Sequence, residues 1–561
     1  DDSVGGDTNN DGPSVGERAQ WQGLYFKPGS EGIFDYVNIS YAGMGGYGNG
    51  DYVGIENDGG ILNIQNSNIH DNYTIGSNGA GGSMSFGAGI YNKSGTLSVS
   101  DSVIDNDVWG IRVDSGTTTI SNNIIKNNVD STGYGPGYGV YAAGSEPLTL
   151  INNTFSGNRR TAYVDASKNF THSGNTSEDR INRGFEMNGS ITGDTTLSGD
   201  DLPFIIGSLT VNTGGTLTLE PGTILKMNDY YSSGNIVVHG NLIAKGTKDN
   251  KIYITSLRDD SVGGDTNGNG DATIPAPKNW QGIFFENSAT GSLSNTIIKY
   301  GGYGGNWTAV YNRGAELSFT DSFVGHNYVS GLFQDNGTTT ISKTEFTDQP
   351  YGIQSRGGTL TLYQNNFHGN TSYAIYNQTD FGNFWYPTRP IQTIDARQNF
   401  WGDSSGPKDT STSTPTGTGD AINNDILYKP FLTENPLVEK RIDPVIIIPG
   451  IMGSAKKNGQ LLIDPILHTY DDLIATLKAN GYEDGKNLFT FPYEWRDSNI
   501  QTANLLKNKI NQVKQTCLAL NDPSTNCSKV DLVAHSMGGL VAREYIQSGQ
   551  YQNDVDQVIF L

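Results

Sequence analysis

The fold of the C-terminal part of this chain is set by one stretch of sequence, Lys529-Val530-Asp531-Leu532-Val533-Ala534-His535-Ser536-Met537-Gly538-Gly539-Leu540-Val541-Ala542-Arg543. The apolar run at 530–534 predicts a buried strand, and residues 537–548 predict a helix. A sharp turn joins them, with Ser536 at its tip. Such a strained turn needs small neighbours, and Ala534 and Gly538 supply them.

Ser536 is the candidate nucleophile, because a strand–turn–helix of this kind exposes its serine and points the positive end of a helix at it. A nucleophile of this type also needs two backbone N–H groups that receive the charge of an oxyanion. We expect these from Met537 and from Ile451, which lies in the glycine-containing loop 449–454 after an apolar strand. The alternative is a Ser-Met-Gly-Gly turn without chemistry.

Three motifs together resemble the lecithin:cholesterol acyltransferase-like branch of the α/β-hydrolases: "PGIMGS" at 449–454, "FPYEWR" at 491–496 and "AHSMGGLVAR" at 534–543. Glu494 stands where family members usually have Asp. The resemblance implies a Ser–Asp–His triad that acts on a lipid ester through an acyl-enzyme. In the chain order of this fold the Asp and His follow the Ser, so we expect both beyond Leu561. Neither His535 nor His468 is expected to replace that histidine.

The residues around these motifs alternate between strand and helix patterns, which predicts an α/β sheet. Strands are expected at 445–448, 488–495, 530–534 and 555–561, and helices at 470–480, 498–518 and 537–548. Ser498 and Gln501 have the spacing of a capping box. Cys517 and Cys527 flank a short loop, and a disulfide or two buried free thiols are equally compatible with this spacing.

The first 430 residues repeat on two scales. Residues 1–9 recur letter for letter as 259–267, and Trp21-Gln22-Gly23 recurs as Trp280-Gln281-Gly282. Within each copy, short β-patterned runs recur about every 21 to 35 residues and are followed by asparagine-rich turns. These features predict the coils of a parallel solenoid, with apolar side chains stacked inside and asparagine ladders at the corners.

This part of the chain resembles the right-handed parallel β-helix repeat proteins, and "NFWGDSSGP" at 399–407 resembles an element that closes such domains. The predicted fold class is therefore mostly β, with two tandem β-helix units followed by a partial α/β-hydrolase domain. We expect unit 1 at 1–187, truncated at its N-terminus, unit 2 at 188–408 and a linker at 409–440. Residues 441–561 would then be the N-terminal half of the hydrolase domain.

The duplicated segments resemble the start of a calcium loop, D-x-[DN]-x-[DN]-G. The candidate ligands are Asp7, Asn9 and Asp11 in the first copy and Asp265, Asn267, Asn269 and Asp271 in the second. The glutamate that closes an EF-hand loop is absent, and a loop of Asx turns without metal is the alternative. Calcium would be structural, and catalysis requires no cofactor.

The net charge of −22 argues against nucleic acid as the main partner, and no apolar run is long enough to span a membrane. We therefore expect an extracellular or cell-surface serine acyl hydrolase or O-acyltransferase. Its β-helix would be a stalk or a surface that binds polysaccharide or cell envelope. The alternatives are an adhesion or carbohydrate-binding β-helix with an inactive hydrolase region, and a β-helix that itself cleaves polysaccharide.

Overall fold

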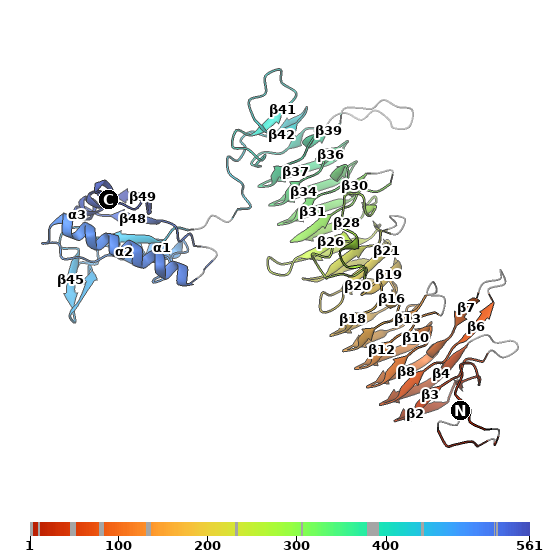
Figure 1. Ribbon diagram of the computed structural model, residues 1–561. Helices are drawn as coiled ribbons and strands as arrows, with labels where there is room; N and C mark the ends of the chain where they lie inside the picture. Colours follow the sequence, from red (N-terminus) through yellow and green to blue (C-terminus); the bar gives the residue numbers. More distant parts are fainter. Residues whose placement is uncertain are drawn as a thin grey trace. The chain divides into compact units, whose positions relative to one another are not determined.

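The structure is a computed structural model that describes residues 4–8, 10, 12–44, 52–77, 83–130, 136–229, 234–304, 307–378, 392–438, 442–520, 522 and 525–561. The chain divides into two compact units, Asp1–Leu437 and Val438–Leu561 (Figure 1). Each unit has its own hydrophobic core. They are therefore described separately.

The N-terminal unit is a parallel β-helix, as predicted, in which each strand pairs in register with a strand of the next coil. One face carries β3 (Asn38–Ser40), β5 (Asn68–His70), β9 (Val103–Asp105), β12 (Ile124–Lys126), β15 (Thr154–Ser156) and β18 (Thr176–Glu178). Another carries β20 (Asp194–Leu197), β22 (Thr216–Leu219), β25 (Asn241–Lys245), β28 (Thr290–Ser294), β31 (Glu316–Thr320), β34 (Thr338–Ser342), β37 (Thr359–Tyr363), β40 (Ile394–Asp395) and β43 (Ile426–Leu427).

The remaining parallel strands of the β-helix form one large connected sheet. These are β1 (Leu24–Phe26), β2 (Glu31–Asp35), β4 (Val53–Gln65), β8 (Ala88–Ser100), β10 (Trp109–Val113), β11 (Thr117–Ser121), β13 (Tyr138–Ala142), β14 (Leu148–Ile151), β16 (Arg160–Asp165), β17 (Phe170–Ser173), β19 (Phe185–Ile191), β21 (Phe204–Val211), β23 (Ile224–Met227), β24 (Asn235–Val238), β26 (Ile252–Ser256), β27 (Gly282–Phe285), β29 (Thr296–Lys299), β30 (Thr308–Asn312), β32 (Phe323–Gly325), β33 (Ser330–Gln334), β35 (Glu345–Thr347), β36 (Tyr351–Ser355), β38 (Asn366–His368), β39 (Tyr373–Asn377), β41 (Pro407–Asp409) and β42 (Gly419–Ile422). An antiparallel hairpin, β6 (Thr74–Ser77) and β7 (Ser83–Phe86), lies beside them.

The asparagine-rich turns of the sequence have a backbone explanation. Residues at the corners of successive coils have left-handed backbone angles, with φ of 51° at Asn66, 51° at Asp101, 57° at Asn122 and 54° at Asn152. Asn and Asp adopt this conformation more readily than other non-glycine residues. The recurrence of these residues therefore sets where each coil bends from one sheet to the next.

Buried asparagines also connect the coils through their side chains, as predicted. In one ladder the amide of Asn123 donates to Asn153 at 3.1 Å and that of Asn153 donates to Asn175 at 3.0 Å. The Asn175 amide then donates to Asp201 at 2.7 Å. Because a carboxylate only accepts hydrogen bonds, an aspartate ends the ladder.

The sequence duplication is also a duplication of contacts. The indole N–H of Trp21 donates to the Ser40 carbonyl at 2.8 Å, and that of Trp280 donates to the Lys299 carbonyl at 2.7 Å. Each pair is separated by 19 residues. The predicted boundary between residues 187 and 188 falls inside β19, and the coils continue across it through the pairing of β19 with β21.

The C-terminal end of the β-helix core is filled by aromatic rings. Phe346 stacks on Phe367 with centroids 5.4 Å apart, and Phe367 stacks on Trp401 at 5.2 Å. Strands β42 and β43 lie within residues 409–440, which we predicted to be a linker, and they pair with β39 and β40 of the β-helix. β41 pairs with β42 and ends at Asp409, the first residue of that predicted linker. The division between the two units falls after Leu437.

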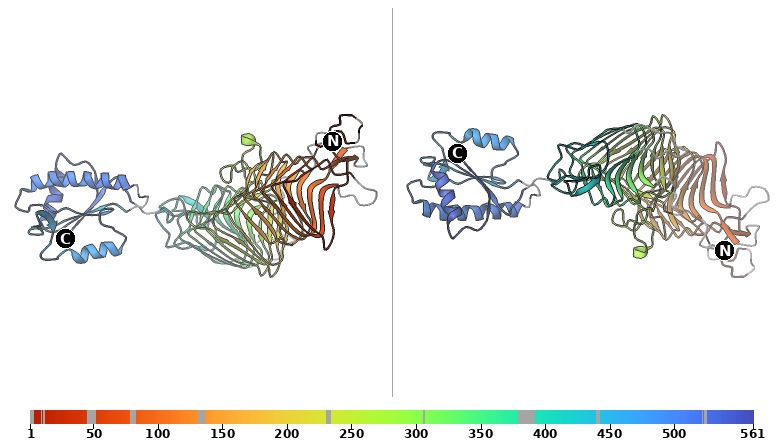
Figure 2. Two further views of the ribbon diagram at one scale, coloured as in Figure 1. Left: turned by 90° about the horizontal axis from the view of Figure 1, so that it is seen from below. Right: turned by 90° about the horizontal axis from the view of Figure 1, so that it is seen from above.

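The C-terminal unit is a parallel sheet between helices (Figure 2). The sheet order is β47 (Leu488–Thr490), β44 (Val445–Ile448), β48 (Val530–Ala534) and β49 (Val555–Phe560). α2 (Asn499–Leu520) and α3 (Met537–Gln547) cover one face, and α1 (Asp471–Ala479) covers the other. The hairpin β45 (Ser454–Lys457) and β46 (Gln460–Ile463) follows the loop after β44.

Most of the elements predicted for the C-terminal unit are present, with one shortened strand. β47 ends at Thr490 and not at residue 495, because Pro492 lacks the N–H that a strand needs to continue. The Ser498 hydroxyl accepts the Gln501 N–H at 3.3 Å, which is one half of the expected capping box. Cys517 and Cys527 form a disulfide. No helix in the described part of the chain combines the length and apolarity needed to cross a membrane.

Candidate active site

Ser536 occupies a two-residue turn between the end of β48 and the start of α3. Its backbone has φ 52° and ψ −120°, a conformation that costs energy in a non-glycine residue. Ser536 is exposed to solvent. Gly538 makes the close packing behind the turn possible. A Cβ there would lie 2.6 Å from the carbonyl oxygens of Ile448 and Pro449. This is the geometry of a nucleophile elbow.

The loop 449–454 lies directly against the serine. A Cβ on Gly450 would be 2.8 Å from the Ser536 Cβ, so only glycine fits there. The Gly453 N–H donates to the Gly450 carbonyl at 3.0 Å, which fixes the plane of the Gly450–Ile451 peptide. In a trans peptide the next N–H, that of Ile451, points opposite to this carbonyl, so its direction is fixed as well.

The two N–H groups that we predicted for an oxyanion hole are available. Within the described residues, neither the Ile451 N–H nor the Met537 N–H donates a hydrogen bond. Met537 is the first residue of α3, where the helix dipole adds positive potential. The roles of Ser536, Met537 and Ile451 in catalysis stay predictions, because no ligand or reaction tests them.

A buried tyrosine, which no sequence motif indicated, connects the loop to the elbow. The hydroxyl of Tyr470 accepts the Gly450 N–H at 2.9 Å and lies 2.8 Å from the Nδ1 of His535. Burial raises the pKa of Tyr470, so the hydroxyl keeps its proton and can donate it to Nδ1. His535 therefore points at Tyr470.

The motif 491–496 supports the other side of the same loop. The hydroxyl of Tyr493 donates to the Pro449 carbonyl at 3.0 Å, and the Tyr493 N–H donates to the Ser454 hydroxyl at 3.1 Å. Burial raises the pKa of Tyr493 to about 12, so it too remains a donor. Glu494, the departure from the family pattern, forms an exposed ion pair with Arg496 at 3.1 Å. The Glu494 carboxylate therefore binds a residue of its own motif, whereas Tyr493 binds the loop 449–454.

The other predicted residues are not part of the elbow: His468 belongs to the same unit, and the candidate calcium ligands belong to the N-terminal unit. His468 is exposed, and its Nδ1 forms a hydrogen bond of 2.9 Å with the Asp471 side chain. In the β-helix, the Asp265 carboxylate accepts the N–H groups of Asn269 at 3.0 Å and Gly270 at 2.9 Å. The first copy repeats one of these bonds, because Gly12 N–H donates to Asp7 at 3.0 Å. Asn9 and Asp11 lie outside the described residues.

Calcium binding by the duplicated loop stays a prediction, and one contact competes with it. The guanidinium of Arg183 lies 3.3 Å from the Asp265 carboxylate, so a cation already balances that charge. The side-chain amides of Asn267 and Asn269 donate to the Thr273 hydroxyl. Asp271 lies in the short 3₁₀ turn Gly270–Ala272. Asp265 and the amides of Asn267 and Asn269 therefore already have partners within the protein.

Comparison with known proteins assigns a family likeness to part of each unit. Residues 14–177 match the family model for the right-handed β-helix region. Residues 460–560 match the model for lecithin:cholesterol acyltransferase, so this segment, which contains the elbow, resembles a lipid acyltransferase family. Searches of curated proteins and of solved structures found no match.

Proposed function

We propose that this protein is a serine acyl hydrolase or O-acyltransferase that acts on lipid esters through an acyl-enzyme at Ser536. The observation that carries the proposal is the strained backbone of Ser536 at an exposed turn, with Gly450 of the neighbouring loop packed against it. A strained residue that the surrounding structure over-determines is typical of a functional site. The likeness of 460–560 to lecithin:cholesterol acyltransferase supports the same class.

In the proposed reaction the Ser536 hydroxyl attacks the ester carbonyl while a histidine takes its proton. Ile451 and Met537 N–H groups would receive the charge on the carbonyl oxygen. The alcohol then leaves with that proton, and water or a second alcohol releases the acyl group from the serine. In the chain order of this fold, that histidine and its aspartate partner follow the serine.

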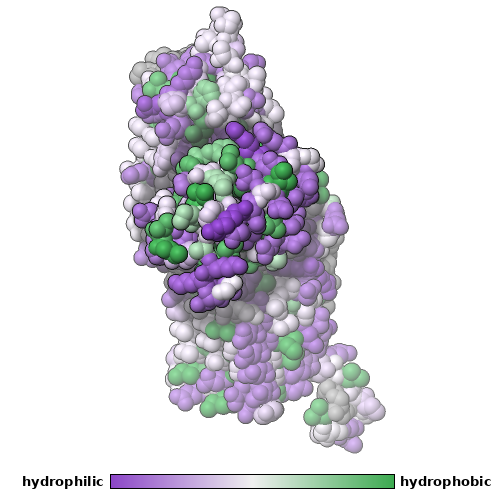
Figure 3. Space-filling view, turned by 90° about the vertical axis from the view of Figure 1, so that its left-hand side faces the viewer, coloured by the Kyte–Doolittle hydropathy of each residue, from purple (hydrophilic) through white to green (hydrophobic). Residues whose placement is uncertain are grey.

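Exposed apolar side chains next to the loop favour a lipid over a water-soluble ester. The exposed fractions are 57% for Ile451 and 62% for Met452 in the loop, and 73% for Ile466 and 65% for Leu467 before α1. Figure 3 shows hydrophobic side chains between hydrophilic ones on the surface of the C-terminal unit. Exposed apolar residues gathered in one segment are typical of surfaces that contact lipid or another apolar partner.

The disulfide between Cys517 and Cys527 supports an exported protein, because such bonds persist in oxidising compartments. We therefore propose that the enzyme acts outside the cell or at its surface. Detection of the protein in the medium or on intact cells with a membrane-impermeant label tests this. Labelling only after lysis contradicts it.

The test of the enzymatic proposal is active-site labelling of the full-length protein with a fluorophosphonate probe. We expect one labelled peptide, which contains Ser536, and no labelling of Ser536→Ala. A Ser528→Ala variant, which changes an exposed serine on the same unit, is the matched control and should label normally. Release of fatty acid from phosphatidylcholine vesicles, with and without an added alcohol, separates hydrolysis from transfer. A wild-type protein that does not label contradicts the proposal.

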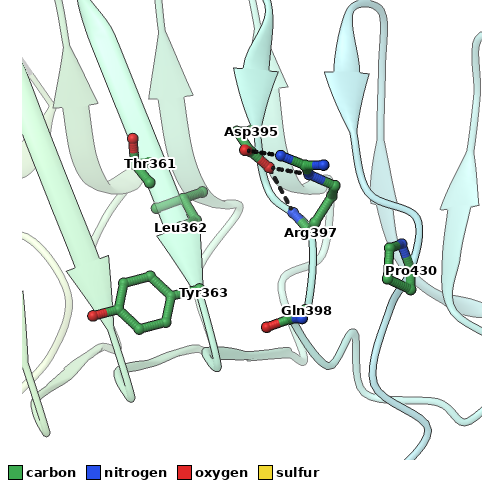
Figure 4. Close-up of a pocket in the computed structure, with 7 residues that line it drawn as sticks. All are labelled: Thr361, Leu362, Tyr363, Asp395, Arg397, Gln398 and Pro430. Atoms are coloured by element: carbon green, nitrogen blue, oxygen red, sulfur yellow. Dashed lines mark hydrogen bonds and ion pairs between the residues drawn. The ribbon is translucent and has the colours of Figure 1, made fainter.

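A second candidate function, carbohydrate binding by the β-helix, rests on an open hollow of about 350 Å³ (Figure 4). It is lined by Thr361, Leu362, Tyr363, Asp395, Arg397, Gln398 and Pro430. Tyr363 is 43% exposed, so its ring is accessible to a ligand. Arg397 and Asp395 form an ion pair at 2.7 Å. An aromatic surface beside paired polar groups suits a sugar ring.

Affinity electrophoresis of the full-length protein through gels that contain soluble polysaccharides tests this second function. We expect retardation in at least one gel and loss of that retardation in Tyr363→Ala. Tyr25→Ala is the matched control, because Tyr25 is 42% exposed on the same unit and outside the hollow. Equal retardation of both variants contradicts binding at this hollow.

A further inference from the structure

The oxyanion loop 449–454 is held by hydroxyl groups from two separate parts of the C-terminal unit. Tyr470 precedes α1 on one face of the sheet, and Tyr493 follows β47. One binds the Gly450 N–H and the other binds the Pro449 carbonyl, so adjacent residues of the loop are fixed from both directions. The positions of oxyanion-hole donors must be fixed before the reaction, because their reorganisation during it costs free energy.

From these contacts we infer that Tyr470 is a positioning residue for the oxyanion hole of the proposed enzyme; this inference rests on the proposed function of Ser536. Tyr470 does not face the reacting atoms: its hydroxyl is occupied by Gly450 and His535. It acts through the loop, because Gly450 packs against Ser536 and precedes Ile451, the predicted donor.

The hydroxyl of Tyr470 joins the two halves of the site. It accepts the Gly450 N–H of the loop and shares a hydrogen bond with Nδ1 of His535, which is the residue before the nucleophile. The ring is 5% exposed and packs with Val445, Ile447 and Val533 of the sheet, so its position is set by the core. Removal of the oxygen alone would therefore keep the packing and break both bonds. The Gly450 N–H would be left buried without a partner, which favours a shift of the loop.

Tyr470→Phe in the full-length enzyme tests the inference, with kcat and KM measured on a short-chain nitrophenyl ester. We expect kcat to fall about 10- to 100-fold and KM to change by less than about threefold, because the loop acts in the transition state. The inhibition constant of a trifluoromethyl ketone, which forms a tetrahedral adduct with a serine, should rise by the same factor as kcat/KM falls.

Tyr482→Phe is the matched control. Tyr482 packs in the same hydrophobic cluster as Tyr470, and its hydroxyl makes no hydrogen bond within the described residues. This variant should keep kcat and the inhibition constant of the wild type. A purely structural role of Tyr470 predicts instead that activity falls with the folded fraction while the inhibition constant stays constant.

Hydrogen-exchange mass spectrometry of the wild type keeps the test independent of how well Tyr470→Phe folds. The Gly450 amide should exchange slowly, and fast exchange there overturns the inference. An unchanged kcat of Tyr470→Phe also overturns the inference. A reduced kcat with an unchanged inhibition constant overturns it as well. Failure of the wild type to label at Ser536 contradicts the proposed function instead, so the two failures are distinguishable.

Discussion

Asp107 occupies a position in the β-helix where neighbouring coils have asparagine. Its Oδ1 accepts the Asn72 N–H at 2.6 Å, as Asn128 and Asn158 accept the N–H of the residue one coil before. The amide of Asn158 then donates to the Ile125 carbonyl at 2.8 Å. The Oδ2 of Asp107 has no hydrogen-bond partner and the residue is fully buried. An ionised Asp107 cannot donate as these amides do.

We predict that Asp107→Asn stabilises the β-helix at neutral pH. Burial raises the pKa of Asp107 well above its ordinary value, so the folded state holds a proton that the unfolded chain releases near pH 4. The contribution of Asp107 to the free energy of unfolding is therefore fully present below about pH 4. It is lost as the pH rises through the raised pKa of Asp107 in the folded state. The asparagine amide of the variant does not ionise, so it avoids the cost of burying a carboxyl at neutral pH. We expect a gain of about 1–3 kcal/mol in the free energy of unfolding at pH 7.

Urea unfolding of both proteins between pH 4 and 8 measures this effect. The gain should shrink toward pH 4, because the wild-type carboxyl is then protonated in both states. Asn128→Asp is the reverse control, since it places a carboxyl at the next position of the same ladder and should destabilise. A gain that is independent of pH would show that Asp107 is not a neutral acid in the folded protein.

Gly450 is the residue at which the loop can be displaced with one methyl group. In Gly450→Ala the new carbon would lie 2.8 Å from the Ser536 Cβ and 3.0 Å from the His535 Nδ1. We expect the fluorophosphonate labelling rate of the full-length protein to fall at least about tenfold, because the loop must move away from the serine. Gly549→Ala should label at the wild-type rate, since a Cβ there meets nothing within 4 Å. Equal rates for all three proteins contradict the contact.

At the scale of elements, the disulfide links the end of α2 to the segment before β48. It closes a loop with a sequence separation of 10 residues, and Cys517 is a buried residue of α2. In the chain-entropy model, removal of such a bond from a loop of this length costs about 3 kcal/mol. We expect Cys517→Ser/Cys527→Ser to destabilise the C-terminal unit by about this amount.

Urea unfolding followed by circular dichroism at the helix band measures the free energy of unfolding of the C-terminal unit. All α-helices in the described part of the chain belong to that unit. Both cysteines of the sequence lie in that unit, so the β-sheet signal should unfold at the same urea concentration in the variant and the wild type. A shift of the β-sheet transition instead would contradict a local effect.

Elements whose signal is local could be predicted from the sequence. β44 and β48 are short, largely apolar runs, and α2 and α3 carry apolar residues at helical spacing. Their type and position in the chain could therefore be predicted from the spacing of apolar residues. The hairpin of β45 and β46 was not predicted, because its strands are half-exposed and lack strict alternation. The strands β42 and β43 were assigned to a linker, since their pairing depends on coils distant in sequence.

The candidate site divides in the same way. The turn at Ser536 and Gly538 could be predicted because a tight turn restricts which residues fit. The close contact of Gly450 with Ser536 was not predicted, since it depends on two segments that are distant in sequence. Tyr470 could not, because nothing in its neighbours indicates that its hydroxyl reaches Gly450, twenty residues earlier, and His535, sixty-five residues later. Polar contacts between elements follow from the fold, and so they appear only once the sheet is assembled.

At the scale of the whole molecule, the two units have separate cores and different kinds of cooperativity. In the β-helix each coil contacts its neighbours through paired strands and asparagine ladders, so stability accumulates coil by coil. The C-terminal unit is one sheet with helices on both faces. We therefore expect two unfolding transitions in urea, one in the β-sheet signal and one in the helix signal.

Asn158→Ala separates these transitions. The Asn158 amide is buried and donates to Asp179 at 2.9 Å and to the Ile125 carbonyl at 2.8 Å. Its removal leaves the Asn128 amide without its 2.8 Å acceptor, and we expect the β-helix to lose about 2–4 kcal/mol, several hydrogen bonds being broken at once. Because the elbow lies in the other unit, the rate of fluorophosphonate labelling at Ser536 and the helix transition should not change. A variant that loses labelling in parallel with the β-sheet signal would show that the hydrolase unit depends on the β-helix for its fold.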